Sequence, residues 1–336
     1  RQLQRRALHQ HAVADDQLAA ALLHQAPAAV LVDRVARLDR RLDLDHRRAM
    51  GELLSEMLVT MSDRGPDSAG IAIYGGDSEV SRSVAKITLQ SHSADTDFAG
   101  LSDEVAAAIE ADGGTVSLAV KDTHAVLLVP VAKAAGVRAV LAGIRPAVRI
   151  MSVGEAIEIY KEVGLPRSVA ERFSVSRMSG THGIGHTRMA TESAVTTMGA
   201  HPFSTGADQC LVHNGSLSNH NSLRRTLIRD GVHFETDNDT EVAAAYLTHK
   251  MQQGASLGEA LESGLDDLDG FYTFVVGTRD GFGVVRDPIA CKPAVMAETD
   301  QYVAFGSEYR ALVNLPGIDA ARVWEPEPAT VYFWTH

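Results

Sequence analysis

The sequence predicts an α+β fold in which antiparallel β-sheets are stacked and flanked by helices. After residue 179 the chain is dominated by short β-branched and aromatic segments separated by glycine turns. Two helical patterns interrupt these segments, and a chain of 336 residues, 45% of them hydrophobic, is long enough to bury a sizeable core. Many short strands with few helices favour packed sheets with the helices outside.

Regular patterns begin near Met50. A helical pattern is followed by a turn and a short buried strand, at residues 51–61, 64–67 and 69–74. Further along, helical patterns at 101–111 and 154–163 are mixed with strand candidates at 115–120 and 124–129. We therefore expect an inserted α/β layer at about residues 84–170.

The second half supplies the strands of the expected sheets. These strands cover residues 183–188, 209–213, 271–277, 282–286, 294–297, 302–306 and 330–334. Two helices, at residues 219–230 and 239–253, interrupt them.

Charge and composition exclude several classes of protein. The formal net charge is -12, so nucleic acid and anionic membrane surfaces are not expected partners. The longest apolar stretch, around residues 125–132, is far shorter than the roughly 20 residues of a spanning helix. No cleavable signal pattern opens the chain, and we expect a cytoplasmic protein. The two Cys cannot form a disulfide framework, and the 14 His show no ligand spacing, so no metal is expected.

Residues 1–49 have an anomalous composition. They use only eight amino-acid types, with nine Arg but no Lys, Gly, Glu, Cys or aromatic residue. One interpretation is a genuine Ala/Leu/Arg-rich helical extension, because runs such as 17–25 and 28–41 are good helix formers. The other is an out-of-frame or misassigned translation of a GC-rich gene. The abnormal alphabet stops where the motifs described next begin, which favours the second interpretation.

Four short motifs place polar residues, glycine and histidine at the ends of expected strands. They read RGPDSAG at 64–70, GHTRMAT at 185–191, HNG at 213–215 and TDNDTE at 236–241. In this order, with Asp239 25 positions after Asn214, they resemble class II glutamine amidotransferases. These belong to the N-terminal nucleophile hydrolases, which implies an αββα fold. The resemblance covers roughly residues 50–336, as a type-2 glutamine amidotransferase domain, apart from the insertion at about 84–170.

Arg188 follows an expected strand, where an Arg on its own is most often part of a surface ion pair. A guanidinium also offers two coplanar donors that match the two oxygens of a free carboxylate. The resemblance implies that Arg188 holds the α-carboxylate of glutamine and that Thr191 adds a hydrogen bond. Family members often carry an aromatic residue and a histidine where this chain has Met189 and Glu192, so the side-chain pocket differs in detail.

Asn214 and Gly215 form the commonest tight-turn dipeptide, but a carboxamide beside an unhindered glycine N–H also suits an oxyanion hole. The resemblance implies the oxyanion hole. Asp239 opens an expected helix, where it fits an N-cap, and the resemblance implies that it binds the substrate α-ammonium group. Arg64 and His201 match family segments, and for both we expect a supporting role.

The nucleophile of this family is missing. Family members use a Cys at the mature N-terminus, and its own α-amino group is the base. An α-amino pKa near roughly 8 lies close to a thiol pKa of about 8.5, so the amine can accept the thiol proton near neutral pH. Counting back from Arg64 places this Cys roughly within positions 24–39, where the chain has none. Cys210 fits a core residue and Cys291 a strand–turn segment, and neither has an α-amino group.

The resemblance is greatest to the free-standing amidotransferase subunits of glutamate-synthase-like enzymes, including N-methylglutamate synthases. It implies that ammonia released from glutamine passes to a separate synthase subunit in a hetero-oligomer. Flavin and iron–sulfur centres would belong to that partner, and no cofactor is expected in this chain, which lacks a phosphate loop and an iron–sulfur cysteine set.

Three hypotheses about function stay open. The first is a glutamine-hydrolysing subunit that lacks its true N-terminus and has little or no activity as written. The second is a non-catalytic glutamine-binding regulatory subunit. The third is another N-terminal nucleophile amidohydrolase with a different amide substrate.

Overall fold

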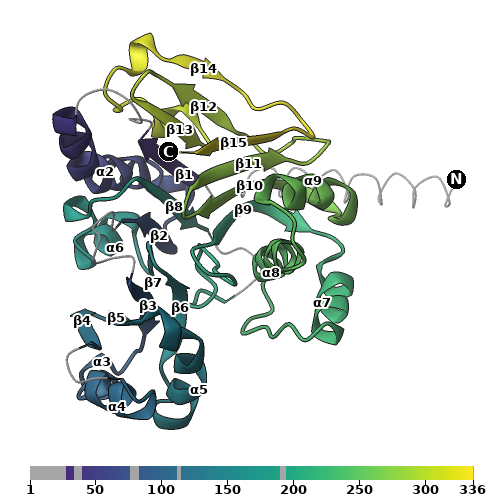
Figure 1. The fold of residues 1–336 in the computed structure, drawn as a ribbon. Helices are drawn as coiled ribbons and strands as arrows, with labels where there is room; N and C mark the ends of the chain where they lie inside the picture. The colour runs from purple at the N-terminus through teal and green to yellow at the C-terminus, as the bar shows by residue number, and fades with distance from the viewer. Residues whose placement is uncertain (1–27, 34–39, 76–82, 112–114, 190–193, 336) are drawn as a thin grey trace, which may run out of the picture.

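The computed structural model describes residues 28–33, 40–75, 83–111, 115–189 and 194–335. Two antiparallel sheets are stacked, as predicted, and a third sheet, of four strands, lies to one side of them (Figure 1). In the described ranges no helix combines the length and the apolar character needed to cross a membrane.

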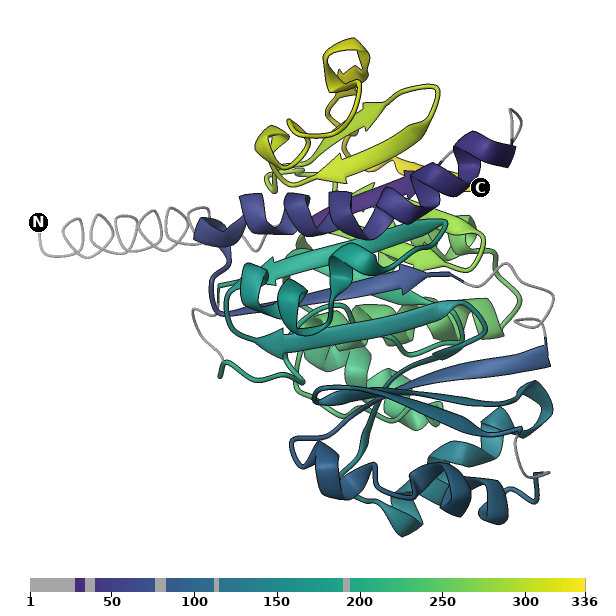
Figure 2. The ribbon, with the colours of Figure 1, turned by 90° about the vertical axis from the view of Figure 1, so that its left-hand side faces the viewer.

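The larger sheet has seven strands in the order β14-β12-β13-β1-β8-β2-β7. Their bounds are β14 (Arg322–Trp324), β12 (Val295–Glu298), β13 (Tyr302–Gly306), β1 (Ala28–Asp33), β8 (His182–Arg188), β2 (Ser68–Tyr74) and β7 (Ile157–Val163). Helices α2 (Arg40–Thr60) and α6 (Pro166–Arg172) cover its outer face (Figure 2). Side chains alternate along β2, so Ile71 and Ile73 pack under these helices while Ala72 and Tyr74 face the second sheet.

The second sheet has the order β15-β11-β10-β9. Its strands are β15 (Val331–Thr335), β11 (Gly281–Arg286), β10 (Gly270–Thr278) and β9 (Cys210–Leu217). Helices α7 (His220–Arg229), α8 (Asp239–Gln252) and α9 (Leu257–Asp267) lie on its outer side. The core between the two sheets contains Ile184 of β8, Cys210 and Val212 of β9, and Phe282 of β11. Cys210 therefore lies in the core, where the Tyr74 hydroxyl donates a hydrogen bond to its Sγ (3.3 Å).

The third sheet belongs to an insertion between β2 and β7. Its elements are β3 (Val84–Gln90), α3 (Ala94–Asp97), α4 (Leu101–Ala108), β4 (Ser117–Lys121), β5 (His124–Pro130), α5 (Ala134–Ile144) and β6 (Arg149–Gly154). The strand order β4-β5-β3-β6, all antiparallel, is that of a ferredoxin-like β-α-β-β-α-β unit. We call residues 84–154 the inserted module. Its helices bury one face of the sheet in a separate core.

The expected insertion at 84–170 is too long, and the helix expected at 154–163 is wrong. The separate sheet ends at Gly154, and the residues that follow form β7, which pairs with β2 along its whole length. The Glu, Ala and Lys residues of this stretch favour helix individually. However, Ile157, Ile159 and Lys161 alternate with Glu158, Tyr160 and Glu162 in the period of two that a strand requires.

The anomalous N-terminal segment lies partly outside the described residues, which exclude 1–27 and 34–39. Of the remainder, β1 pairs antiparallel with both β13 and β8, and α2 runs across the expected boundary at Met50. The strand lies within positions 24–39, where the family resemblance places the opening strand.

Candidate functional site

The predicted site residues meet at one end of the two stacked sheets. Arg188 is the last residue of β8, Asn214 and Gly215 lie near the end of β9, and Asp239 is the first residue of α8. The first residue of β1, Ala28, is the register partner of His186, two positions before Arg188. Because these strands belong to two packed sheets, the motifs converge although they are far apart in the sequence.

Arg188 is buried to 9% exposure between acidic neighbours. Burial lowers the pKa of its guanidinium, while the charges of Asp67 and Asp239 act in the opposite direction. Its Nη1 donates to the backbone oxygen of Ala194 (3.5 Å), and the backbone N–H of Asp67 donates to its carbonyl oxygen (3.0 Å). The guanidinium is therefore held at the strand end, close to two carboxylates. Thr191, the expected second contact, and Glu192 lie outside the described residues.

Asn214 continues the face of β9 on which Cys210 and Val212 pack between the sheets. Its side chain is 2% exposed, and neither Oδ1 nor Nδ2 has a hydrogen-bond partner among the described residues. A buried amide without protein partners costs free energy, and both ends of this amide are available to bind a ligand or a water molecule.

Gly215 has a φ of +144°, which favours glycine. An added Cβ would lie 1.8 Å from the Phe271 carbonyl oxygen and 2.9 Å from His213 Nε2. Only glycine fits at this position, because the Phe271 carbonyl oxygen and the His213 ring occupy the space that a side chain would need.

Asp239 does not cap α8. The N-cap is Asn238, whose Oδ1 accepts a hydrogen bond from the Thr240 N–H (2.8 Å). Asp239 is instead the first helical residue, and its Oδ2 accepts from the backbone N–H of Leu217 (2.9 Å). This contact ties the start of α8 to the end of β9, and the carboxylate stays near Arg188 and near His213 Nδ1 (3.8 Å).

A cluster of buried histidines behind the site was not predicted. The Thr240 hydroxyl bridges His201 Nε2 (2.8 Å) and His213 Nδ1 (3.2 Å), and the His201 ring stacks on His186. Burial lowers the pKa of His186 to about 3 and that of His201 well below its usual range, so both rings are neutral near pH 7. His201 thus supports Thr240 at the start of α8. The motifs contain His186, His213 and Thr240, but the contact of the Thr240 hydroxyl with both His201 and His213 is recognisable only once β9 and α8 are packed.

Arg64 lies at the edge of the site in a surface ion cluster. Its Nε is 2.9 Å from Glu308 Oε1, and Arg310 contacts both Glu308 (2.9 Å) and Asp63 (3.0 Å). These pairs connect the turn before β2 to the segment after β13.

In the described ranges no three His, Cys, Asp or Glu side chains are grouped so that they could hold a metal ion.

Neither cysteine lies where a nucleophile is expected. Burial raises the pKa of the Cys210 thiol to about 12, so it is protonated at neutral pH. Cys291 is partly exposed and follows β11 in the chain. The start of β1, the position beside the strand of Arg188, carries alanine.

Comparison with known proteins identifies the family. The glutamine amidotransferase domain matches residues 186–314. The chain is 69% identical over 287 residues to the glutamine amidotransferase-like protein GlxB of Rhizobium meliloti (strain 1021), a match that covers 85% of this chain and 93% of the relative. The chain belongs to the class II glutamine amidotransferases. The domain match includes Arg188, Asn214, Gly215 and Asp239.

Relatives with further activities are longer than this chain. The amidophosphoribosyltransferase of Methanocaldococcus jannaschii is 31% identical over 183 residues, which cover 54% of this chain and 38% of the relative. The solved glutamine phosphoribosylpyrophosphate amidotransferase from B. subtilis has a TM-score of 0.56 at 18% identity, covering 92% of this chain and 47% of that one. The chain thus spans less than half the length of both proteins, and the structural likeness shows the fold alone.

Proposed function

We propose that the chain is the glutamine-binding subunit of an amidotransferase that passes ammonia to a separate synthase subunit. The observation that carries this proposal is that the guanidinium of Arg188, buried at the end of β8, lies within the electrostatic influence of the Asp239 carboxylate at the start of α8. A free amino acid carries the complementary pair of charges. Arg188 would bind the α-carboxylate and Asp239 the α-ammonium group.

Groups suited to hydrolysis of the side-chain amide of glutamine lie at the same end of the sheets. The unpartnered Asn214 amide and the backbone at Gly215 are suited to stabilise the oxyanion of a tetrahedral intermediate. A cysteine at the start of β1 would complete the site, with its α-amino group as base. The chain has none there, and loss of a nucleophile costs on the order of a million-fold in turnover, so we propose that the chain as written binds glutamine without hydrolysing it.

Two alternatives remain. A non-catalytic regulatory subunit is favoured by β1 itself, which is paired on both sides although it lacks the cysteine. Another N-terminal nucleophile amidohydrolase would share the oxyanion hole but not the recognition of an α-amino acid.

The partner remains a proposal from the family resemblance. We propose a glutamate-synthase-like subunit, such as that of an N-methylglutamate synthase, that accepts ammonia and carries flavin and iron–sulfur centres in a hetero-oligomer. Arg188 and Asp239 recognise glutamine and no cofactor in this scheme.

Calorimetry with three ligands tests glutamine binding. Glutaramic acid lacks the α-ammonium group of glutamine, and 4-aminobutanamide lacks the α-carboxylate. We expect glutamine to bind at least tenfold more tightly than either analogue, because each leaves one buried charge unpaired. Equal affinity for all three ligands, or no binding of glutamine, contradicts the proposal. Copurification of the chain with a flavin-containing subunit from its source organism tests the partner.

A further inference from the structure

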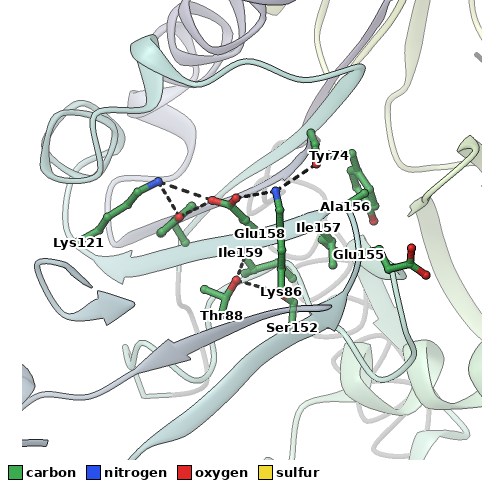
Figure 3. A network of polar contacts seen from close by, with 12 residues as sticks. Tyr74, Lys86, Thr88, Lys121, Ser152, Glu155, Ala156, Ile157, Glu158 and Ile159 are labelled. Atoms are coloured by element: carbon green, nitrogen blue, oxygen red, sulfur yellow. Dashed lines mark hydrogen bonds and ion pairs between the residues drawn. The ribbon is translucent and has the colours of Figure 1, made fainter. Parts of the chain in front are cut away.

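The open face of the inserted module packs against β7 through a polar network (Figure 3). Lys86 Nζ contacts Glu158 Oε1 (2.9 Å) and donates to the Gly75 carbonyl oxygen (3.1 Å). Lys121 Nζ donates to the Tyr160 hydroxyl (2.8 Å), which donates to Glu158 Oε2 (2.6 Å). Two strands of the module are therefore attached to one strand of the main sheet.

The turn between β6 and β7 is also fixed. The Asp208 carboxylate accepts hydrogen bonds from three successive backbone N–H groups, at Glu155 (2.8 Å), Ala156 (2.8 Å) and Ile157 (3.0 Å). A Cβ at Gly154 would lie 2.1 Å from Asp208 Oδ1, so glycine is needed for this close approach. The module and β7 are thus joined with little freedom at their connection.

Glu162, further along β7, bridges the module and a segment next to the site. Its Oε2 accepts from the hydroxyl of Thr123, in the turn between β4 and β5 (3.1 Å). Its Oε1 accepts from the hydroxyl of Thr197. The carboxylate is 6% exposed, and Arg172 Nη1 lies 3.7 Å from it. One buried carboxylate therefore contacts the inserted module and residues 194–202 at the same time.

Lys161, on the opposite face of β7, holds the same segment. Its Nζ donates to the carbonyl oxygens of Met198 (3.3 Å), Ala200 (2.8 Å) and Pro202 (3.3 Å). Burial lowers the pKa of the Lys161 ammonium group to about 8, and nearby carboxylates oppose this effect. Because this pKa is above 7, the ammonium form persists near pH 7 and donates these hydrogen bonds. Lys161 and Glu162, whose side chains lie on opposite faces of β7, thus both form hydrogen bonds with segment 194–202.

Segment 194–202 in turn contacts the guanidinium of Arg188. The carbonyl oxygen of Ala194 accepts from Arg188 Nη1, and a Cβ on Gly199 would lie 3.4 Å from the same nitrogen. The Gly199 N–H donates to the Thr196 hydroxyl (3.1 Å), which shapes the turn at this point. A displacement of the segment would therefore change the environment of Arg188.

We propose that Glu162 is a positioning residue for the glutamine site, through which the inserted module sets segment 194–202 and, with it, Arg188. Lys161 acts as the second support of the same segment. This inference rests on the proposed binding of glutamine at Arg188. It adds a role for the inserted module, which contributes none of the candidate site residues. A ligand or subunit that moved the turn between β4 and β5 would alter the affinity for glutamine.

Calorimetry on the full chain tests the inference with two variants remote from the ligand. Thr123→Val removes the hydroxyl on the module, and Glu162→Gln removes the charge at the bridge. We expect roughly 3- to 30-fold weaker glutamine binding in each, the range typical of residues that couple to a distant site. Thr96→Val, the same substitution at an exposed position of α3, is the matched control and should bind as the wild type does.

A double-mutant cycle separates positioning from general destabilisation. If Thr123 and Thr197 act through Glu162, the losses from Thr123→Val and Thr197→Val are not additive. Additive losses, or unchanged affinity in Thr123→Val and Glu162→Gln, overturn the inference while leaving the glutamine site intact. Failure of the wild type to bind glutamine refutes the proposed function instead.

Hydrogen exchange provides a readout that does not depend on glutamine. In the free chain, the amides of residues 196–201 should exchange at least several-fold faster in Glu162→Gln than in the wild type, with no change in the helix α9. Unchanged exchange in residues 196–201 overturns the positioning role even if no ligand binds. Glu162→Asp, which keeps the charge, should restore part of the protection.

Discussion

The ring of His186 on β8 stacks on the ring of His201, with centroids 4.2 Å apart and an angle of 30° between the planes. The two rings lie in a buried group that is neutral in the folded chain, because burial lowers the pKa of both. A third buried ring, that of His124 in the inserted module, has its pKa lowered by burial to about 3.

These histidines predict a loss of stability in mild acid. The unfolded chain binds protons at each histidine below its ordinary pKa of about 6.5, while the folded chain does not until about pH 3 at His186 and His124. Their contribution is therefore complete above about pH 6.5 and falls by about 1.4 kcal/mol per pH unit per histidine below it. Urea unfolding at pH 7.5, 6.5 and 5.5 measures this slope. His124→Phe should reduce the slope of the unfolding free energy with pH more than His92→Phe, the matched change at an exposed position, does. An unfolding free energy that does not change with pH would show that the histidines are not held in the neutral form by burial.

Arg188→Lys tests the planar recognition of a carboxylate. Lysine keeps the charge but loses the paired donors, so glutamine binding should weaken roughly 10- to 100-fold. Binding of 4-aminobutanamide, which has no carboxylate, should change far less. Calorimetry with both ligands gives the comparison, and exposed Arg229→Lys is the control. Equal losses for the two ligands would show that Arg188 does not contact the carboxylate.

Gly215→Ala should destabilise the chain strongly, because both the backbone φ of +144° and the contact with the Phe271 carbonyl oxygen exclude a side chain. Gly231 offers a matched comparison, since its φ is +90° but no atom lies within 4 Å of an added Cβ. We expect about 1 kcal/mol for Gly231→Ala and at least about 2 kcal/mol more for Gly215→Ala. Thermal and urea unfolding measure the difference, and similar values would remove the steric argument.

The two thiols should differ in reactivity. Cys210 is 1% exposed with a pKa raised by burial to about 12, whereas Cys291 is partly exposed. In the folded chain, a disulfide reagent at pH 8 should modify Cys291 within minutes and Cys210 only at the rate of unfolding. Cys291→Ser is expected to remove the fast phase. If the fast phase of modification persists in this variant, Cys210 is accessible to the reagent, and a role for it as the nucleophile would have to be tested.

The placement of the candidate site residues could be predicted from the motifs, because each motif lies at a strand or helix end, while their roles in binding and catalysis stay predictions. Arg188 ends β8, Asn214 lies near the end of β9 and Asp239 begins α8. Contacts between residues far apart in the sequence were not predictable in this way. The bridge from Thr123 through Glu162 to Thr197 depends on how an inserted sheet packs on β7.

Local propensity explains the errors. The stretch at 154–163 contains helix-favouring residues, but pairing with β2 along seven positions outweighs their preference. At Asp239 the residue type suited an N-cap, yet Asn238 provides the cap and leaves the aspartate to bind the Leu217 N–H. Which of two adjacent polar residues caps a helix depends on where the preceding chain enters, and the sequence alone does not show this.

Restoring a cysteine at the start of β1 tests the whole catalytic arrangement. A chain that begins with this cysteine in front of the strand, with residues 1–27 removed, should release glutamate from glutamine if Asn214 and Gly215 form the oxyanion hole. In this background Asn214→Ala should lower kcat by about 100- to 1000-fold with little change in KM, because the amide acts on the transition state. Asp239→Asn should mainly raise KM, because the ammonium contact exists in the ground state as well.

The matched control is the same chain with a methionine retained before the cysteine, which keeps the thiol but removes its α-amino group. It should fold equally well and be almost inactive, because the base has been lost. Activity that is equal in both chains would mean that another group accepts the thiol proton, and His186, the register partner of Ala28, would be the first residue to substitute. Hydrolysis of other amides but never of glutamine, by the folded restored chain, would instead favour an amidohydrolase that shares this fold with a different substrate.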